Sequence, residues 1–119
     1  MAIRRLERAE WAEFCARASR GYLGKQVELE VLSAEIGCQV QVHGLPLIGL
    51  SYDPKDDLIE VSVGELSHFI RTPRRFYVDE DPLGDISFQV IDVDDTRRII
   101  TLHEPLMLPA PGRDGYGPP

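Results

Sequence analysis

The chain has 119 residues, 43% of them hydrophobic and 28% charged, which is the composition of an ordinary folded domain and excludes disorder of the whole chain. Its net charge of -7 comes from 13 basic and 20 acidic residues, and such a balance disfavours binding to phosphate backbones and to anionic bilayers. We therefore expect no nucleic-acid and no membrane partner. We expect one domain over residues 1–104, followed by a C-terminal tail over 105–119 that is rich in proline and glycine.

The first expected element is a helix over residues 7–19. Its apolar residues recur at spacings of three and four and form one stripe, made of Leu6, Trp11, Phe14, Cys15 and Ala18. Gly21 stands where a C-terminal cap is favoured. We interpret Trp11 and Phe14 as core anchors rather than a ligand platform, because aromatic residues at this spacing are usually buried.

After Gly24 the hydrophobic period changes to two, which is typical of strands with one buried face. Residues 27–31 and 36–42 are expected to pair as a hairpin. In this register Cys38 points inward, and a buried thiol in apolar surroundings is inert. Residues 44–46, which are Gly-Leu-Pro, are expected to break the chain.

A second hairpin is expected from residues 47–52 and 59–63, joined by a turn in which proline fixes the backbone and aspartates bond it locally. Later elements are less regular. Residues 66–71 form a strand or a helical turn, 72–75 a loop, 76–78 a brief strand, 79–85 an acidic loop, and 86–90 and 99–102 two strands around a turn at 94–96. One helix followed by six or seven short antiparallel strands indicates an α+β fold, with a strongly curved meander that closes toward a small barrel or half-barrel.

The two cysteines, Cys15 and Cys38, are expected to stay free. The basic start of the chain is followed by charged residues instead of an apolar segment, so no signal peptide is expected, and no run of about 18 apolar residues predicts a membrane span. Both features favour a cytoplasmic protein, where thiols stay reduced.

Few residues carry a pattern typical of catalysis or metal binding. The three histidines, His43, His68 and His103, lack the spacing of a zinc motif, and the acidic loops lack the register of a calcium loop. No nucleophile elbow and no glycine-rich phosphate loop occur. We therefore expect no metal, no cofactor and no catalytic residue that the sequence identifies.

One basic cluster stands out in this acidic chain. Arg71, Arg74 and Arg75 lie close together, with Tyr77 and His68 on either side. Guanidinium groups pair with carboxylate or phosphate, and aromatic rings stack on apolar groups, so these five residues are the candidate contact for a small anion or an acidic partner. The alternative is a solvated loop whose arginines only balance the acidic residues nearby.

The sequence resembles a family of short bacterial proteins known only as a domain of unknown function. The resemblance lies in Trp11 and Phe14, in the strand at 27–30, in residues 68–73, and above all in residues 45–57, which read Leu-Pro-Leu-Ile-Gly-Leu-Ser-Tyr-Asp-Pro-Lys-Asp-Asp. It covers about residues 6 to 104. It implies a bacterial, cytoplasmic, single-domain protein, and it brings no catalytic residues with it.

Three functions remain open at this point. The first is a non-catalytic binding or protein-interaction module, with an unknown protein or a small anion as its partner and homo-oligomers as a further option. The second is a small acid–base enzyme that uses His68 or His43 with a nearby carboxylate. The third is a structural protein that acts through bulk association. A concave pocket that gathers polar groups from separate strands would distinguish them.

Overall fold

The structure, a computed structural model, describes residues 2–80 and 85–103, and the expected tail at 105–119 lies outside them. Strand β1 comes first and is followed by a short 3₁₀ helix, η1, and by one α-helix, α1. In chain order the elements are β1 (Ala2–Arg5), η1 (Arg8–Glu10), α1 (Trp11–Gly21), β2 (Gln26–Ser33), β3 (Gly37–Asp53), β4 (Leu58–Val63), β5 (Leu66–Arg71), β6 (Pro73–Glu80), β7 (Ile86–Asp92) and β8 (Arg97–His103).

All eight strands belong to one antiparallel sheet, in the order β1-β6-β7-β8-β2-β3-β4-β5. The two end strands, β1 and β5, do not pair with each other, so the sheet is open. The expected α+β fold, an N-terminal helix followed by a sheet that closes toward a barrel, is therefore wrong: the described residues form mainly antiparallel sheet with one short α-helix, and strand β1 precedes that helix. The strand order is not that of a simple meander either, because β8 returns to pair with β2.

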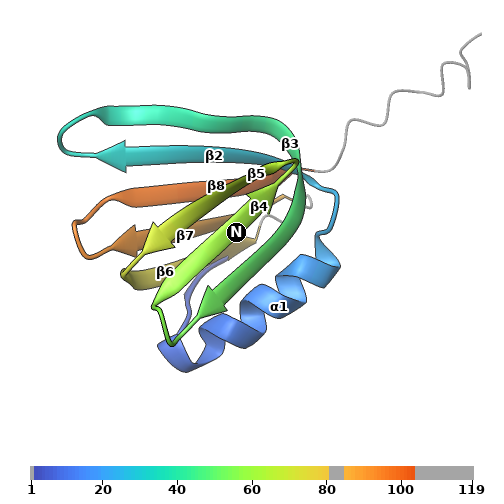
Figure 1. Ribbon diagram of the computed structural model, residues 1–119, viewed down its shortest axis with the longest axis horizontal. Coiled ribbons are helices and arrows are strands. Elements are labelled where there is room, and N and C mark those ends of the chain that lie inside the picture. Colours follow the sequence, from blue (N-terminus) through green and yellow to red (C-terminus); the bar gives the residue numbers. More distant parts are fainter. Residues whose placement is uncertain (1, 81–84, 104–119) are drawn as a thin grey trace, which may run out of the picture.

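The longest strand, β3, changes partners along its length. Its first part pairs with β2 and its second part with β4. The change occurs near the Gly-Leu-Pro segment that was expected to end a strand, where Gly44 has a φ of +83°. The segment bends the strand instead of ending it, and β3 then carries β4 and β5 in front of β6, β7 and β8 (Figure 1).

The core lies between these strands and α1. The expected helix stripe is confirmed, since Trp11, Phe14, Cys15 and Ala18 are all buried. The ring of Phe14 contacts Phe88 edge to face, with 5.5 Å between the ring centroids. These contacts fix α1 over the side of the sheet that Figure 1 shows next to β3.

A side-chain hydrogen bond fastens the other side of α1 to β3. The Ser19 hydroxyl donates to the carbonyl oxygen of Leu50 at 2.6 Å and accepts from the Leu50 amide at 2.7 Å. It therefore satisfies the two Leu50 main-chain groups on the edge of β3 that faces away from its partner strand β4.

The first hairpin forms, but its expected register is wrong. Leu32 pairs with Cys38, and a bulge lies between Leu29 and Glu30. The bulge changes which residues of β3 face the core, so Val42 is buried whereas Val40 and Cys38 are exposed. Cys38 therefore does not point inward.

The second hairpin, β3–β4, agrees with its prediction, and the Asp53 carboxylate accepts the Lys55 amide at 2.9 Å in its turn. Residues 66–71 form strand β5. The loop expected at 72–75 is wrong, because strand β6 begins at Pro73 and carries Arg74 and Arg75. Within the described residues, no helix has the length and apolar character that crossing a bilayer requires.

Candidate functional site

Two of the three clustered arginines line a surface depression. Its volume is about 480 Å³, and its walls are formed by the side chains of Arg5, Arg74, Arg75, Asp92, Val93 and Asp95. These residues come from β1, from β6, and from the end of β7 with the turn that follows it. The depression therefore gathers polar groups from separate strands, and its presence keeps the acid–base enzyme open as an alternative to a binding module.

Strand pairing explains why these arginines converge. Strand β1 pairs with β6 and places Arg5 opposite Tyr77. On the other side of β6, a register shift between Pro73 and Arg75 breaks the strict alternation of faces, so that Arg74 and Arg75 are both exposed. Three guanidinium groups are thereby held at one end of the sheet.

The carboxylates of the depression do not neutralise these arginines. Asp92, which is 7% exposed, is already occupied, because its carboxylate accepts the amides of Asp94 and Thr96 and pairs with Arg98. Asp95 lies 3.8 Å from Arg75, but both side chains are well exposed and such a pair contributes little.

The side chains of Arg5 and Arg74 form no hydrogen bond or ion pair with any other residue that the structure describes. Guanidinium groups that line one recess repel one another, so the arrangement has unused capacity for a negative group. The depression can thus accept the oxygens of a carboxylate or a phosphate.

The remaining candidate residues do not join the depression. Arg71 lies at the end of β5, opposite Leu58, and Tyr77 lies beside Arg5 on the outward side of β6. His68 is half-buried, and burial together with the nearby Arg98 lowers its pKa. Its Nε2 atom is buried without a partner, and no carboxylate of the described residues forms a hydrogen bond with it.

Arg5 is the residue that sequence reasoning missed. Its strand has only four residues, and two of them are arginines, so no hydrophobic alternation marks it. Without β1, strand β6 would be an exposed edge of the sheet, and such an edge tends to be covered by a further strand. The strand order is needed to know that β6 would be an edge, so the sequence could not indicate the pairing of β1.

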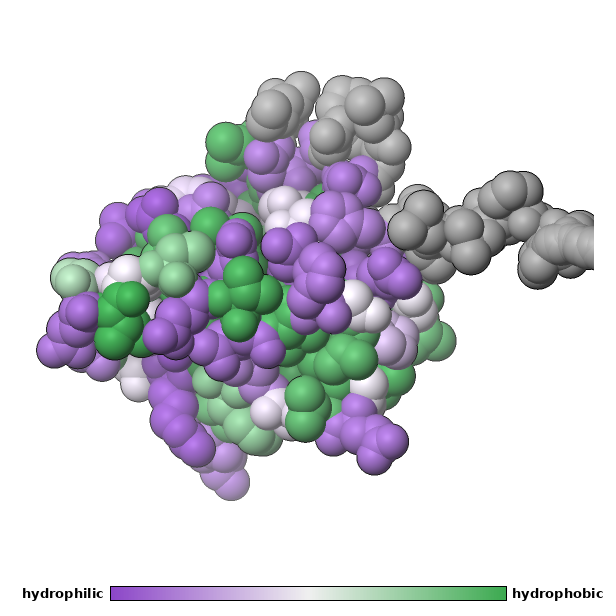
Figure 2. All heavy atoms as spheres, turned by 90° about the horizontal axis from the view of Figure 1, so that it is seen from above, coloured by the Kyte–Doolittle hydropathy of each residue, from purple (hydrophilic) through white to green (hydrophobic). Residues whose placement is uncertain are grey.

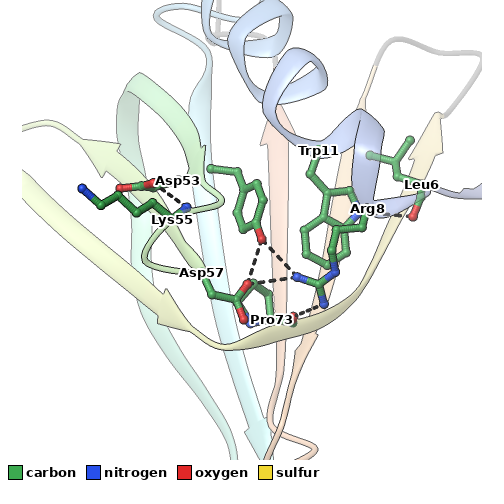
Figure 3. A network of polar contacts seen from close by, with 8 residues as sticks. Leu6, Arg8, Trp11, Asp53, Lys55, Asp57 and Pro73 are labelled. Atoms are coloured by element: carbon green, nitrogen blue, oxygen red, sulfur yellow. Dashed lines mark hydrogen bonds and ion pairs between the residues drawn. The ribbon is translucent and has the colours of Figure 1, made fainter.

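A second polar cluster ties three parts of the fold together (Figure 3). The Arg8 guanidinium donates to the Tyr52 hydroxyl, to the Asp57 carboxylate and to the Pro73 carbonyl oxygen, each at 3.0 Å. It also lies over the Trp11 ring, 4.5 Å from the centroid. Both of its terminal nitrogens, Nη1 and Nη2, have acceptors, which distinguishes Arg8 from Arg5 and Arg74 of the depression.

The ionisation of this cluster is consistent with a structural role. Burial acts to lower the pKa of Arg8, but its hydrogen bonds to Tyr52 and Asp57 outweigh burial and raise that pKa. Burial, and then the hydrogen bond to Asp57, raise the pKa of Tyr52, whose hydroxyl donates to the carboxylate at 2.8 Å. Tyr52 of β3 and Asp57 of the turn after it both lie in the segment 45–57, on which the family resemblance mainly rests.

No group of three or more His, Cys, Asp or Glu side chains suited to a metal ion occurs among the described residues. Burial raises the pKa of Cys15 to about 12, so this thiol does not ionise near neutral pH.

The fold and the depression define a small antiparallel-sheet domain with an arginine-lined recess and one supporting helix. The chain belongs to a family of unknown function, DUF5335, whose model matches residues 2–111, so the resemblance found in the sequence is confirmed. An uncharacterized protein of Aquifex aeolicus is 36% identical over 110 residues, which is 92% of this chain and 99% of that protein.

A solved structure supports the fold alone. The crystal structure of the Bacillus subtilis YojF protein matches with a TM-score of 0.55 at 9% identity, covering 91% of this chain and all of that one. At this identity the likeness extends to the arrangement of the strands and not to any site.

Proposed function

We propose that this protein is a non-catalytic binding module that holds an oxyanion, a carboxylate or a phosphate, in the depression formed by Arg5, Arg74 and Arg75. The observation that carries the proposal is the convergence of three guanidinium groups from β1 and β6 on one recess of about 480 Å³. In a chain of net charge -7, this is a local reversal of sign.

Binding of an oxyanion offsets the electrostatic repulsion among the guanidinium groups of Arg5, Arg74 and Arg75. Guanidinium groups present rigid forks of N–H donors that match two oxygens of a carboxylate or phosphate. Because Arg5 and Arg74 have no described partner, an incoming oxyanion has no internal ion pair to displace at these two side chains. The floor of the recess is held rigid by Asp92, whose carboxylate is fixed by two main-chain amides.

The described lining of the depression favours binding over catalysis. Arginine does not give up its proton near neutral pH, and the two described carboxylates are those of Asp92, which is held by two amides and Arg98, and Asp95, which lies beside Arg75. The acid–base alternative required His68 or His43 beside a carboxylate. His68 lies next to Arg98 instead, and a positively charged neighbour disfavours the protonated imidazole.

The proposal predicts that oxyanions stabilise the fold through these arginines. Thermal unfolding in increasing phosphate or citrate, at constant ionic strength, should show a midpoint that rises with the logarithm of the anion concentration. The rise should shrink at higher salt, because exposed charges are screened. The double variant Arg74→Ala, Arg75→Ala should lose the rise.

The matched control is Arg71→Ala, since Arg71 is an exposed arginine of β5 outside the depression. This variant should keep the wild-type response. Equal responses from the double variant and the wild type, or no response to any oxyanion, would show that the depression is not a binding site.

A further inference from the structure

The side of the sheet that faces away from α1 presents a regular array of partly exposed side chains from β6, β7, β8 and β2. Along β2 and β8, and along β6 from Phe76 and β7 up to Val90, every second side chain is buried against the core, and the residues between them point the other way. We call this second side the outer face. Within the described residues no helix covers it, because α1 packs on the opposite side.

The centre of the outer face is apolar and hollowed. Two shallow grooves, of about 260 Å³ and about 120 Å³, share the side chains of Ile3, Tyr77 and Gln89. Ile99 lines the smaller groove, and Ile3 is 69% exposed. Seen from above, the surface of the molecule carries hydrophobic side chains interleaved with hydrophilic ones (Figure 2).

Charges of opposite sign flank this centre. The register aligns Arg75, Ile91 and Arg97 in one row across β6, β7 and β8. On the neighbouring strand β2, Glu30 lies opposite Ile99 in the next row, and Glu28 lies opposite Thr101 in the row after that. The basic side chains thus lie toward one corner of the outer face and the acidic ones toward the other.

One of these charges lacks an internal partner. The exposed Arg97 side chain makes no hydrogen bond or ion pair with another described residue, although Glu30 is its diagonal neighbour on β2. The other three have only weak or exposed contacts, Arg75 with Asp95 at 3.8 Å, Glu28 with His103 at 3.7 Å and Glu30 with the Cys38 thiol at 3.9 Å. In addition, the Oδ1 atom of Asp79, which lines the smaller groove, is buried without a hydrogen-bond partner. An unsatisfied carboxylate oxygen beside an open groove is costly unless a donor arrives from outside.

We propose that the outer face is the interface of a homodimer. In an isologous dimer one patch must be complementary to itself, and a patch with an apolar centre and opposite charges at two corners meets this condition. A two-fold axis that lies in the plane of contact, crosses the strands diagonally and passes midway between Gln89 and Ile99 places Arg97 of one copy against Glu30 of the other. The same axis brings Arg75 toward Glu28.

The area of the outer face suits this partner. Its five strands, β1, β6, β7, β8 and β2, span about 20 Å at the usual strand spacing, and its rows extend about 20 Å along the strands. A face of this size buries on the order of 1,000 Å² in total between two copies, which is near the lower limit of specific interfaces. Charge pairing is therefore expected to decide whether the dimer forms, and salt should weaken it.

A charge exchange between two variants tests the interface. Sedimentation velocity and light scattering at micromolar to millimolar concentration should show a dimer of the 13.4 kDa chain. Arg97→Glu alone and Glu30→Arg alone should each weaken association at least about tenfold, because each places like charges together at two symmetric positions. An equimolar mixture of the two variants should regain the dimer, because only the mixed pair restores opposite charges.

The control is Arg71→Glu, which changes the same charge on β5, away from the outer face, and should leave the dimer intact. Circular dichroism confirms that each variant is folded. A monomeric wild type, single variants that dimerise as the wild type does, or a mixture of folded variants that stays monomeric would each overturn the proposal. This test does not involve Arg74, so its failure leaves the oxyanion proposal standing.

Discussion

Arginine side chains of similar exposure have two different environments in this protein. Arg8 makes three hydrogen bonds and covers the ring of Trp11, whereas Arg5 and Arg74 project into a recess without a described partner. The first environment contributes to the fold. The side chains of Arg5 and Arg74 make no described contact that stabilises the fold. This difference from Arg8 is the main reason for proposing that the depression binds a ligand.

The two cysteines differ just as sharply, and their reactivity gives a prediction. Cys38 is exposed on β3, while Cys15 is fully buried on α1 with its pKa raised to about 12. A maleimide or disulfide reagent should therefore modify Cys38 in the native protein at low concentration, and Cys15 only after unfolding. Mass spectrometry after short labelling checks this.

The Cys38→Ser variant serves as the control for this labelling. It should remain unmodified until denaturant is added. Rapid modification of the variant in native buffer would mean that α1 does not cover Cys15 in the way described, and slow modification of the wild type would mean that Cys38 is shielded.

At the scale of elements, the Arg8 cluster joins η1 to the β3–β4 turn and to the start of β6. Arg8→Ala removes donors from the Tyr52 hydroxyl, the Asp57 carboxylate and the Pro73 carbonyl oxygen. Asp57 keeps the hydroxyl donor of Tyr52, but the Tyr52 hydroxyl and the Pro73 carbonyl oxygen are partly buried and lose the donor that Arg8 provides. Such acceptors without a donor cost stability, so we expect a loss of about 1–3 kcal/mol in the free energy of unfolding. Urea unfolding measures this loss.

Arg4→Ala is the matched comparison, because Arg4 pairs with Glu10 at 3.5 Å and both side chains are more than half exposed. Its expected loss is below about 0.5 kcal/mol. If the two variants lost equal stability, the Arg8 cluster would be an ordinary surface pair.

Some elements could be predicted from the sequence because their pattern is local. The stripe of α1 and the alternation of β4 and β7 repeat over enough residues to be recognised, and each buries the residues expected. Strand β1 and the length of β3 could not be predicted. The first is too short to show a period, and the second depends on a partner exchange between β2 and β4, which is a property of the whole sheet.

The residues of the candidate site likewise divide into those that a local sequence pattern identifies and those that only the strand order brings together. Arg74 and Arg75 could be chosen from their density of charge, and the structure places both in the depression. Arg71 is only three residues before Arg74 in sequence but lies on a different strand, since Thr72, with a φ of +52°, separates β5 from β6. Arg5 lies at the site because strand β1 pairs with β6, and only the strand order reveals this pairing.

At the scale of the whole molecule, the open sheet offers two distinct surfaces to other molecules. One is the depression at the end of β6 and β7, and the other is the outer face with its opposite charges. Arg75 borders both, so a negative group bound in the depression lies next to the proposed dimer interface. Membership of a family of unknown function leaves both roles to be established by direct measurement.

The most direct measurement is a titration followed through the arginine side chains themselves. Nuclear magnetic resonance resolves the Nε–H group of each arginine, and phosphate is added at constant ionic strength. Our account predicts saturable shifts for Arg5, Arg74 and Arg75, weaker at high salt, with Arg8 and Arg71 unchanged. Shifts that fail to saturate, or that appear equally on arginines outside the depression, would contradict it.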